Sequence, residues 1–224
     1  MRSVLTGIVF VCALCLPRPA ASYMLECFAD ADATMVRPES PALVPAVFAA
    51  PALEARAIWL SDSLLRWPGV AAAGRFRLHY STDGSAVAEP GARVTGADGS
   101  LDLEPFAGPL PPAVAERFRH VAARITLRTL ASRATRRGLQ RKQLLLVQQD
   151  PEGHVIRATR LQSAAALDAL YPAAERARLG TAIAHGRTTF ALWAPTARNV
   201  PLCLYENGRD IAQSLQPMRF DNAT

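Results

Sequence analysis

Five aromatic side chains carry the clearest binding chemistry in this sequence: Trp59, Trp67, Trp193, Tyr80 and Tyr205. An indole or phenol ring presents a flat apolar face, and such a face can stack on a sugar ring. Trp59 and Trp193 also lie inside apolar runs, where packing in a protein core is the competing interpretation. We take Trp67, Trp193 and Tyr205 as the candidate carbohydrate-binding residues.

The sequence shows no set of side chains with the spacing of a catalytic site. The carboxylates that stand out, at Asp62, Glu104, Asp168 and Glu206, fall at expected turns or helix starts, where solvation or capping explains them. The histidines are scattered along the chain without the spacing of metal ligands, at His79, His120, His154 and His185. We predict no catalytic residue, no metal site and no cofactor.

Positive charge gathers between Arg117 and Lys142, and Lys142 is the only lysine in a chain with a formal net charge of +6. Phosphate binding requires cations clustered on one face of the molecule. Here the cations extend over an expected helix and a linker, and no nucleic-acid motif accompanies them. A solvated surface is therefore the favoured interpretation, and we predict no nucleic-acid partner.

The chain opens with a basic residue, a short apolar run from Val4 to Leu16, and small residues near Ser22. This order is typical of a secretory signal peptide, and the run is too short to cross a bilayer. We predict a signal peptide over 1–22, a secreted or periplasmic location, and no membrane span after cleavage. Cleavage removes two arginines and no acid, so the formal charge falls from +6 to +4. Cys27 and Cys203 then remain, and the sequence does not decide whether they form a disulfide.

Residues 23–53 are rich in alanine, proline and acids without periodicity, which predicts a linker or leader. Strands are expected after it, and then a mixture of helices and strands. The expected strands are 55–60, 64–67, 75–80, 101–103, 125–130, 143–149 and 154–161, and the expected helices are 112–124 and 164–171. The structure of 131–141 is undefined by the pattern.

Residues 185–208 read HGRTTFALWAPTARNVPLCLYENG, with apolar residues alternating on both sides of a proline-containing corner at 194–199. Alternation indicates two antiparallel strands, and Asn207-Gly208 indicates a tight hairpin turn into a third. The fold class predicted is mainly β with some α (α+β). It comprises a β-sandwich-type domain over 54–182 with helical insertions and a truncated sandwich over 186–224.

The segment FALWAPTARNVPLCLYENG resembles the start of the immunoglobulin-like starch-binding module that precedes the catalytic barrel in debranching enzymes of the α-amylase class. Upstream, ARAIWLSDSLLRWP, FRLHYS and GHVIRATRLQSAAALDALY follow in the order expected for the preceding domain of bacterial pullulanase-type α-1,6-glucosidases. The resemblance covers residues 54–222. It implies a glycoside hydrolase family, with the catalytic TIM barrel absent from this chain.

Two functions remain open from the sequence. The resemblance implies an N-terminal part of a secreted debranching hydrolase that binds or positions α-glucan (starch, glycogen or pullulan) and is itself inactive. The alternative is a stand-alone secreted β-sandwich protein with a binding or scaffolding role. Whether this chain counts as an enzyme stays uncertain on either interpretation.

The export prediction is tested by N-terminal sequencing of material recovered from the periplasm or medium. We expect a mature chain beginning next to Ser22, because the small residues there suit a signal peptidase. A recovered chain that still starts at Met1 contradicts the prediction.

Overall fold

The computed structural model describes residues 53–208 and 210–221. The predicted signal peptide, and all of the predicted leader except Leu53, lie outside these residues. The described chain divides into two compact units. One contains residues 53–198 and 219–221, and the other contains the described residues between 199 and 218.

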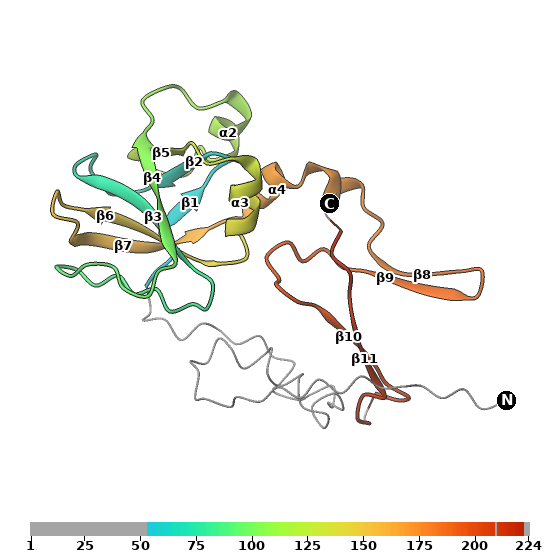
Figure 1. Ribbon diagram of the computed structural model, residues 1–224. Helices are drawn as coiled ribbons and strands as arrows, with labels where there is room; N and C mark the ends of the chain where they lie inside the picture. Colours follow the sequence, from blue (N-terminus) through green and yellow to red (C-terminus); the bar gives the residue numbers. More distant parts are fainter. Residues whose placement is uncertain (1–52, 209, 222–224) are drawn as a thin grey trace. The chain divides into compact units, whose positions relative to one another are not determined.

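The first unit contains most of the secondary structure (Figure 1). Its strands are β1 (Ala57–Trp59), β2 (Leu64–Trp67), β3 (Arg75–Ser81), β4 (Gly99–Pro105), β5 (Ile125–Thr129), β6 (Gln143–Gln149), β7 (Val155–Gln162), β8 (Gly180–Ala184) and β9 (Arg187–Ala191). Its helices are α2 (Pro112–Arg117), α3 (Arg133–Leu139), α4 (Ala164–Leu170) and the 3₁₀ helix η4 (Pro172–Arg176). The second unit contains β10 (Pro201–Leu204) and β11 (Ser214–Pro217).

The first seven strands form a closed barrel in the order β1-β2-β5-β4-β3-β6-β7. All neighbours pair antiparallel except β1 and β7, which run parallel and close the sheet, with Ala57 opposite Leu161. The predicted β-sandwich for this domain is therefore wrong. Alternating residues show only that one face of each strand is buried, and a sandwich and a barrel share that pattern.

The barrel interior is an apolar core built from alternate residues of its strands. Phe76 and Leu78 of β3 point into it, and Trp59, Leu65 and Leu127 are fully buried there. Burying one such side chain stabilises the fold by about 1.5–3 kcal/mol. The mainly-β class is thus confirmed, and its core is the lumen of the barrel.

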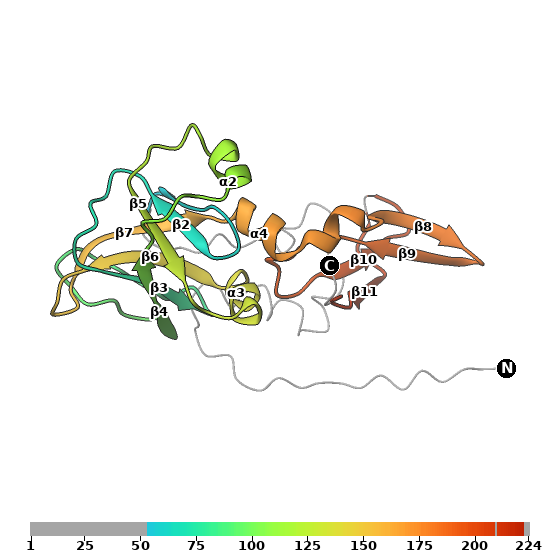
Figure 2. The same ribbon diagram turned by 90° about the horizontal axis from the view of Figure 1, so that it is seen from above.

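Two helices lie side by side at one end of the barrel (Figure 2). Ser132 caps α3 by accepting a hydrogen bond from the Thr135 amide at 3.1 Å. Leu139 and Leu170 join the core from α3 and α4. The segment 131–141, which the sequence pattern left undefined, is therefore a capped helix that helps to close the barrel end.

Arginines of α3 satisfy the last carbonyls of α4. Arg133 Nη2 donates to Ala169 O and Leu170 O at 2.9 Å, and Arg137 Nη2 donates to Leu170 O at 2.7 Å. The Arg137 guanidinium also lies 4.5 Å from the centroid of the Tyr171 ring. Cations near a helix C-terminus are favourable. Two members of the predicted solvated cluster thus hold helices together.

The predicted helix over 112–124 is too long. The observed α2 ends at Arg117, and none of its residues is buried. A short helix is stabilised mainly by the packing of its apolar face. Because α2 packs no residue into a core, the helix does not continue through residues 118–124. The next segment returns to the sheet, where Ile125 begins β5 rather than continuing the helical face.

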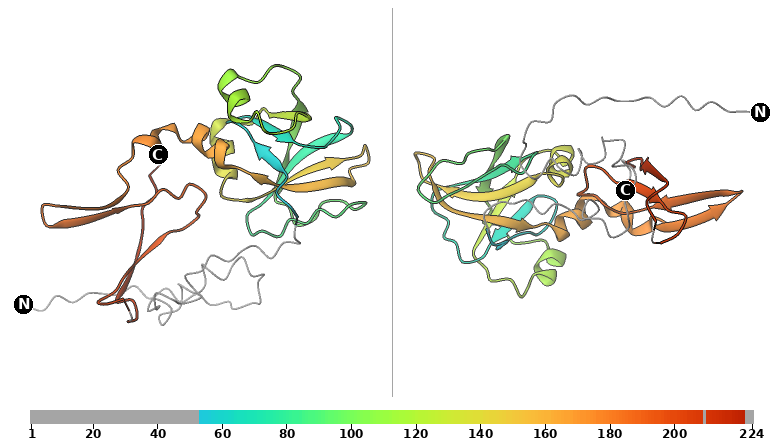
Figure 3. Two further views of the ribbon diagram at one scale, coloured as in Figure 1. Left: turned by 180° about the vertical axis from the view of Figure 1, so that it is seen from behind. Right: turned by 90° about the horizontal axis from the view of Figure 1, so that it is seen from below.

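The strands on either side of the corner at 194–199 do not pair with each other in the described structure. Instead β9 pairs with β8, with Thr181 opposite Phe190, and β10 pairs with β11 (Figure 3). Two residues, His185 and Gly186, join β8 to β9, with φ of 50° and 70°. That pair is the two-residue hairpin turn, and Asn207-Gly208 lies in the longer connection between β10 and β11.

The contribution of the arginine contacts at the end of α4 to stability can be measured. Replacing Arg137 with Ala removes its hydrogen bonds to Leu170 O and its contact with Tyr171. We expect a loss of about 1–3 kcal/mol in the free energy of unfolding, measured by urea denaturation. Arg119→Ala is the control, because Arg119 makes an exposed ion pair with Glu116, and should cost about 0.5 kcal/mol or less. Equal effects of the two substitutions would contradict the capping role.

Candidate functional site

A segment without regular strands, residues 82–98, covers part of the outside of the barrel (Figure 3). Beneath it lies a second, smaller core in which Ala86 and Ala88 pack with Leu145, Val147 and Val155. We call residues 82–98 the outer flap. Because the flap packs on Leu145 and Val147, β6 is buried on both faces, whereas β7 keeps exposed residues such as Ile156.

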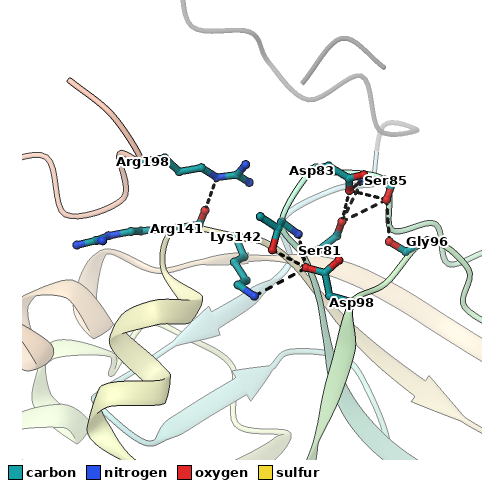
Figure 4. Close-up of polar contacts among 9 residues, drawn as sticks. Ser81, Asp83, Ser85, Gly96, Asp98, Arg141, Lys142 and Arg198 are labelled. Atoms are coloured by element: carbon teal, nitrogen blue, oxygen red, sulfur yellow. Dashed lines mark hydrogen bonds and ion pairs between the residues drawn. The ribbon is translucent and has the colours of Figure 1, made fainter. Parts of the chain in front are cut away.

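Polar contacts fasten the two ends of the flap (Figure 4). Asp83 Oδ1 accepts hydrogen bonds from the Ser81 hydroxyl at 2.6 Å and from the Ser85 amide at 3.0 Å. Asp98 Oδ2 accepts from the Thr82 amide at 2.7 Å, and Lys142 Nζ lies 3.8 Å away. These bonds tie the flap to the end of β3.

Hydrogen bonding favours the ionised form of both flap carboxylates. The hydroxyl of Ser81 and then that of Ser85 lower the pKa of Asp83 to about 2. The hydroxyl of Thr82 is the main cause that lowers the pKa of Asp98. Both side chains thus remain charged acceptors at neutral pH, and their contacts account for their positions without a ligand.

Two of the tryptophans belong to the barrel core. Trp59 is fully buried and Trp67 is 3% exposed, and the Trp67 ring packs edge-on against Phe76 with 6.4 Å between centroids. The core interpretation is right for Trp59. The faces of Trp67 are covered by neighbouring side chains, so this arrangement leaves them no room for a sugar ring.

Trp193 follows β9 and is 36% exposed. The β8–β9 hairpin and its flanks also expose Leu179, Ile183, Phe190 and Leu192. An exposed group of apolar side chains marks a surface that contacts another molecule or another part of a fold. The packing of Trp193 in a core, one of the two interpretations of the sequence, is not what this structure shows.

Tyr205 follows β10 in the second unit, and its side chain is half-buried. Cys203 lies two residues before it as a free thiol, and Cys27 is outside the described residues. The structure therefore places the three candidate residues in three settings: Trp67 in the barrel core, Trp193 at the hairpin, and Tyr205 beside β10.

The acidic residues singled out in the sequence have structural partners. Asp62 pairs with Arg136 at 3.3 Å and Asp168 with Arg117 at 2.7 Å. In the same way, Glu104 pairs with Arg128 at 3.2 Å, and Glu206 accepts a hydrogen bond from Gln213 at 3.0 Å.

Within the described part of the chain, no group of three histidine, cysteine or acidic side chains is arranged to hold a metal ion. Every helix in that part is too short or too polar to cross a bilayer.

Comparison with known families adds the decisive observation. The model of the Pullulanase N2 domain matches residues 54–169, which is more than half of the chain. The chain belongs to the pullulanase N2 domain family. Behind the N2 domain, residues 178–222 match carbohydrate-binding module 48, the isoamylase N-terminal domain. The two domains are the N-terminal, non-catalytic part of a pullulanase-type enzyme.

Two curated relatives agree with this assignment. Pullulanase of Klebsiella pneumoniae is 31% identical over 171 residues, which is 76% of this chain and 15% of the relative. Pullulanase 1 of Arabidopsis thaliana, a chloroplastic protein, is 31% identical over 156 residues, which is 69% of this chain and 16% of the relative. The chain thus spans about one sixth of the length of these relatives.

Solved structures match the chain as well. PulA of Klebsiella pneumoniae in complex with maltotriose superposes with a TM-score of 0.66 and 27% identity, covering 85% of this chain and 20% of PulA. PulA of Klebsiella oxytoca gives a TM-score of 0.64 and 29% identity, covering 77% of this chain and 16% of PulA. The fold of this chain therefore matches part of the solved PulA structures.

The flap contacts of the N2 domain predict a pH dependence. The folded pKa of Asp83, about 2, lies below the ordinary value of about 3.9, so the folded state binds fewer protons between these values. The stabilisation from Asp83 is complete above about pH 4 and is lost as the pH falls towards 2.

We expect Asp83→Asn to lower stability at pH 7, and the difference from wild type to shrink near pH 2. Urea denaturation across this range measures the difference, and Glu89→Gln, which changes an exposed carboxylate of the same flap, should have little effect. A carboxyl pKa of Asp83 near 4 in an NMR titration contradicts the expectation.

Proposed function

We propose that this chain supplies the α-glucan-binding and substrate-positioning domains of a debranching hydrolase that acts on α-1,6 branches of starch-like glucans. The observation that carries the proposal is the match to carbohydrate-binding module 48 directly behind an N2 domain. Related pullulanases have been crystallised with maltotriose, an α-glucan. The partners proposed are starch, glycogen and pullulan.

We also propose the domain division of the chain: a signal peptide over 1–22, a leader over 23–53, the N2 domain over 54–182 and a part of an immunoglobulin-like module over 186–224. The family matches at 54–169 and 178–222 support the two larger domains. The basic, apolar and small residues of the first 22 positions support a secreted or periplasmic location.

Trp193 is the residue at which we place glucan contact in the first unit. Its ring is exposed next to the exposed Phe190 and Leu192, so an apolar sugar face can reach it. Tyr205 is the separate candidate in the second unit, where the phenol hydroxyl adds a polar contact to the ring. Trp67 acts indirectly, since it supports the barrel from within the core.

Affinity electrophoresis in gels containing pullulan tests the proposal. We expect wild type to be retarded relative to a gel without polysaccharide, and Trp193→Ala to bind about threefold to tenfold more weakly, the range expected for one lost stacking contact. Phe106→Ala is the matched control, because Phe106 is a half-buried aromatic of the barrel far along the chain, and it should bind like wild type.

The outcomes are distinct. Equal retardation of Trp193→Ala and wild type removes Trp193 from the site but leaves binding intact, and the same measurement on Tyr205→Ala then tests the second candidate. Absence of any retardation of the folded wild-type chain by pullulan, starch and glycogen contradicts the proposed function.

A further inference from the structure

One buried histidine lies beside barrel residues that contact the outer flap. His79 lies on the outer face of β3, two residues before Ser81, and is 8% exposed. Its backbone is opposite Leu145 of β6 and Ser100 of β4. Within the described part of the chain its Nε2 has no hydrogen-bond partner. The ring is thus largely enclosed, and one of its nitrogens has no hydrogen-bond partner among the described residues.

The surroundings of the ring disfavour a positive charge. Burial is the main cause that lowers the pKa of His79, and the positive charge of Arg77 acts in the same direction. Hydrogen bonding with the Gln149 side chain and the charge of Asp102 act the other way. Since Asp102 is already paired with Arg77 at 2.7 Å, little of its charge remains to stabilise a second cation.

The same outer face holds the flap in place. Leu145, opposite His79, packs against Ala86 and Ala88 of the flap. Ser81, next but one to His79, donates to Asp83, and the Gln143 side chain bonds both the amide and the carbonyl of Ala86, at 2.9 and 3.0 Å. Two neighbours of His79, Ser81 and Leu145, thus contact the flap directly.

We propose that the outer flap is a pH-sensitive cover, closed over the barrel while His79 is neutral and released when His79 takes up a proton. Protonation in the closed state places a charge in an enclosed site beside Arg77, whereas the open state hydrates it. The open state therefore binds the proton more tightly, and acidification below the ordinary histidine pKa of about 6.5 shifts the flap towards opening.

The other charged groups of this region do not explain such a transition. Asp83 and Asp98 hold the flap with lowered pKa values, so both stay ionised between pH 7 and pH 5. Lys142 pairs with Asp98. His154 lies at the β6–β7 turn, where its Nδ1 is 3.2 Å from Asp150, and it is the one other histidine next to the flap-facing strands.

Hydrogen–deuterium exchange of the whole chain tests the proposal, with rates corrected for the intrinsic pH dependence of exchange. We expect peptides of 82–98 to lose protection between pH 7 and pH 5. A single proton limits the change to about tenfold per pH unit. His79→Gln, which keeps a polar side chain but cannot be protonated, should remove this dependence, and His154→Gln should retain it.

Each result decides the proposal. Loss of protection in wild type and in His154→Gln, but not in His79→Gln, supports it. Unchanged protection in wild type, or the same loss in His79→Gln, overturns it. If His79→Gln does not fold, an NMR titration of the wild-type ring takes its place, and a His79 pKa at or above 6.5 overturns the proposal. Tryptophan fluorescence from the buried Trp59 and Trp67 distinguishes flap opening from global unfolding, which would also count against it.

Discussion

The parallel pairing of β1 with β7 is the constraint on which the rest of the first unit depends. It joins Ala57 to Leu161 and turns an open antiparallel sheet into a barrel with an enclosed core. The strand β1 has only three residues, so side chains add to its few ladder bonds. Thr159 Oγ1 accepts from the Arg56 amide at 2.9 Å and donates to Glu54 O at 2.7 Å. Buried edges must be paired in this way, because unpaired backbone groups are costly away from water.

Closure of the sheet also determines what packs against each of its two faces. The inner face supplies the main core, and the flap covers part of the outer face with a second core. Helices α3 and α4 close one end, held by arginine contacts to backbone carbonyls. A group of exposed apolar residues that includes Phe190 and Trp193 lies outside the barrel, on the β8–β9 hairpin and its flanks. The binding surface that we propose in the first unit thus lies outside the barrel.

The sequence predicts local features well and long-range ones poorly. Alternation located β3 because one of its faces packs in the barrel core, and the mainly-β class followed from short runs of this kind. The sequence left both core packing and ligand contact open for Trp193 and did not show that Trp67 is buried, since burial is decided by which segments come together and not by neighbours in sequence. The packing of the outer flap on β6 was not predicted for the same reason, because it joins segments far apart in the sequence.

The turns show how far a two-residue sequence pattern can predict the position of a tight turn. Asn207-Gly208 has the composition of a tight turn but lies in a long connection, whereas His185-Gly186 makes the two-residue turn. Positive φ is uncommon outside glycine, and histidine is among the residues that tolerate it. The signal was present in the sequence as a glycine between two alternating runs. Which of the two glycines turns the chain depends on which strands find partners.

The closing pair joins residues about one hundred positions apart, and this distance has a kinetic consequence. Contacts between distant residues form slowly, because the chain must lose the entropy of a large loop before any pairing compensates for it. The β6–β7 hairpin, whose turn spans residues 150–154, forms over a short distance and is available early. During synthesis β1 is made before β7, with which it pairs. One edge of β1 therefore stays unpaired, and accessible to other chains, until residue 162 has left the ribosome.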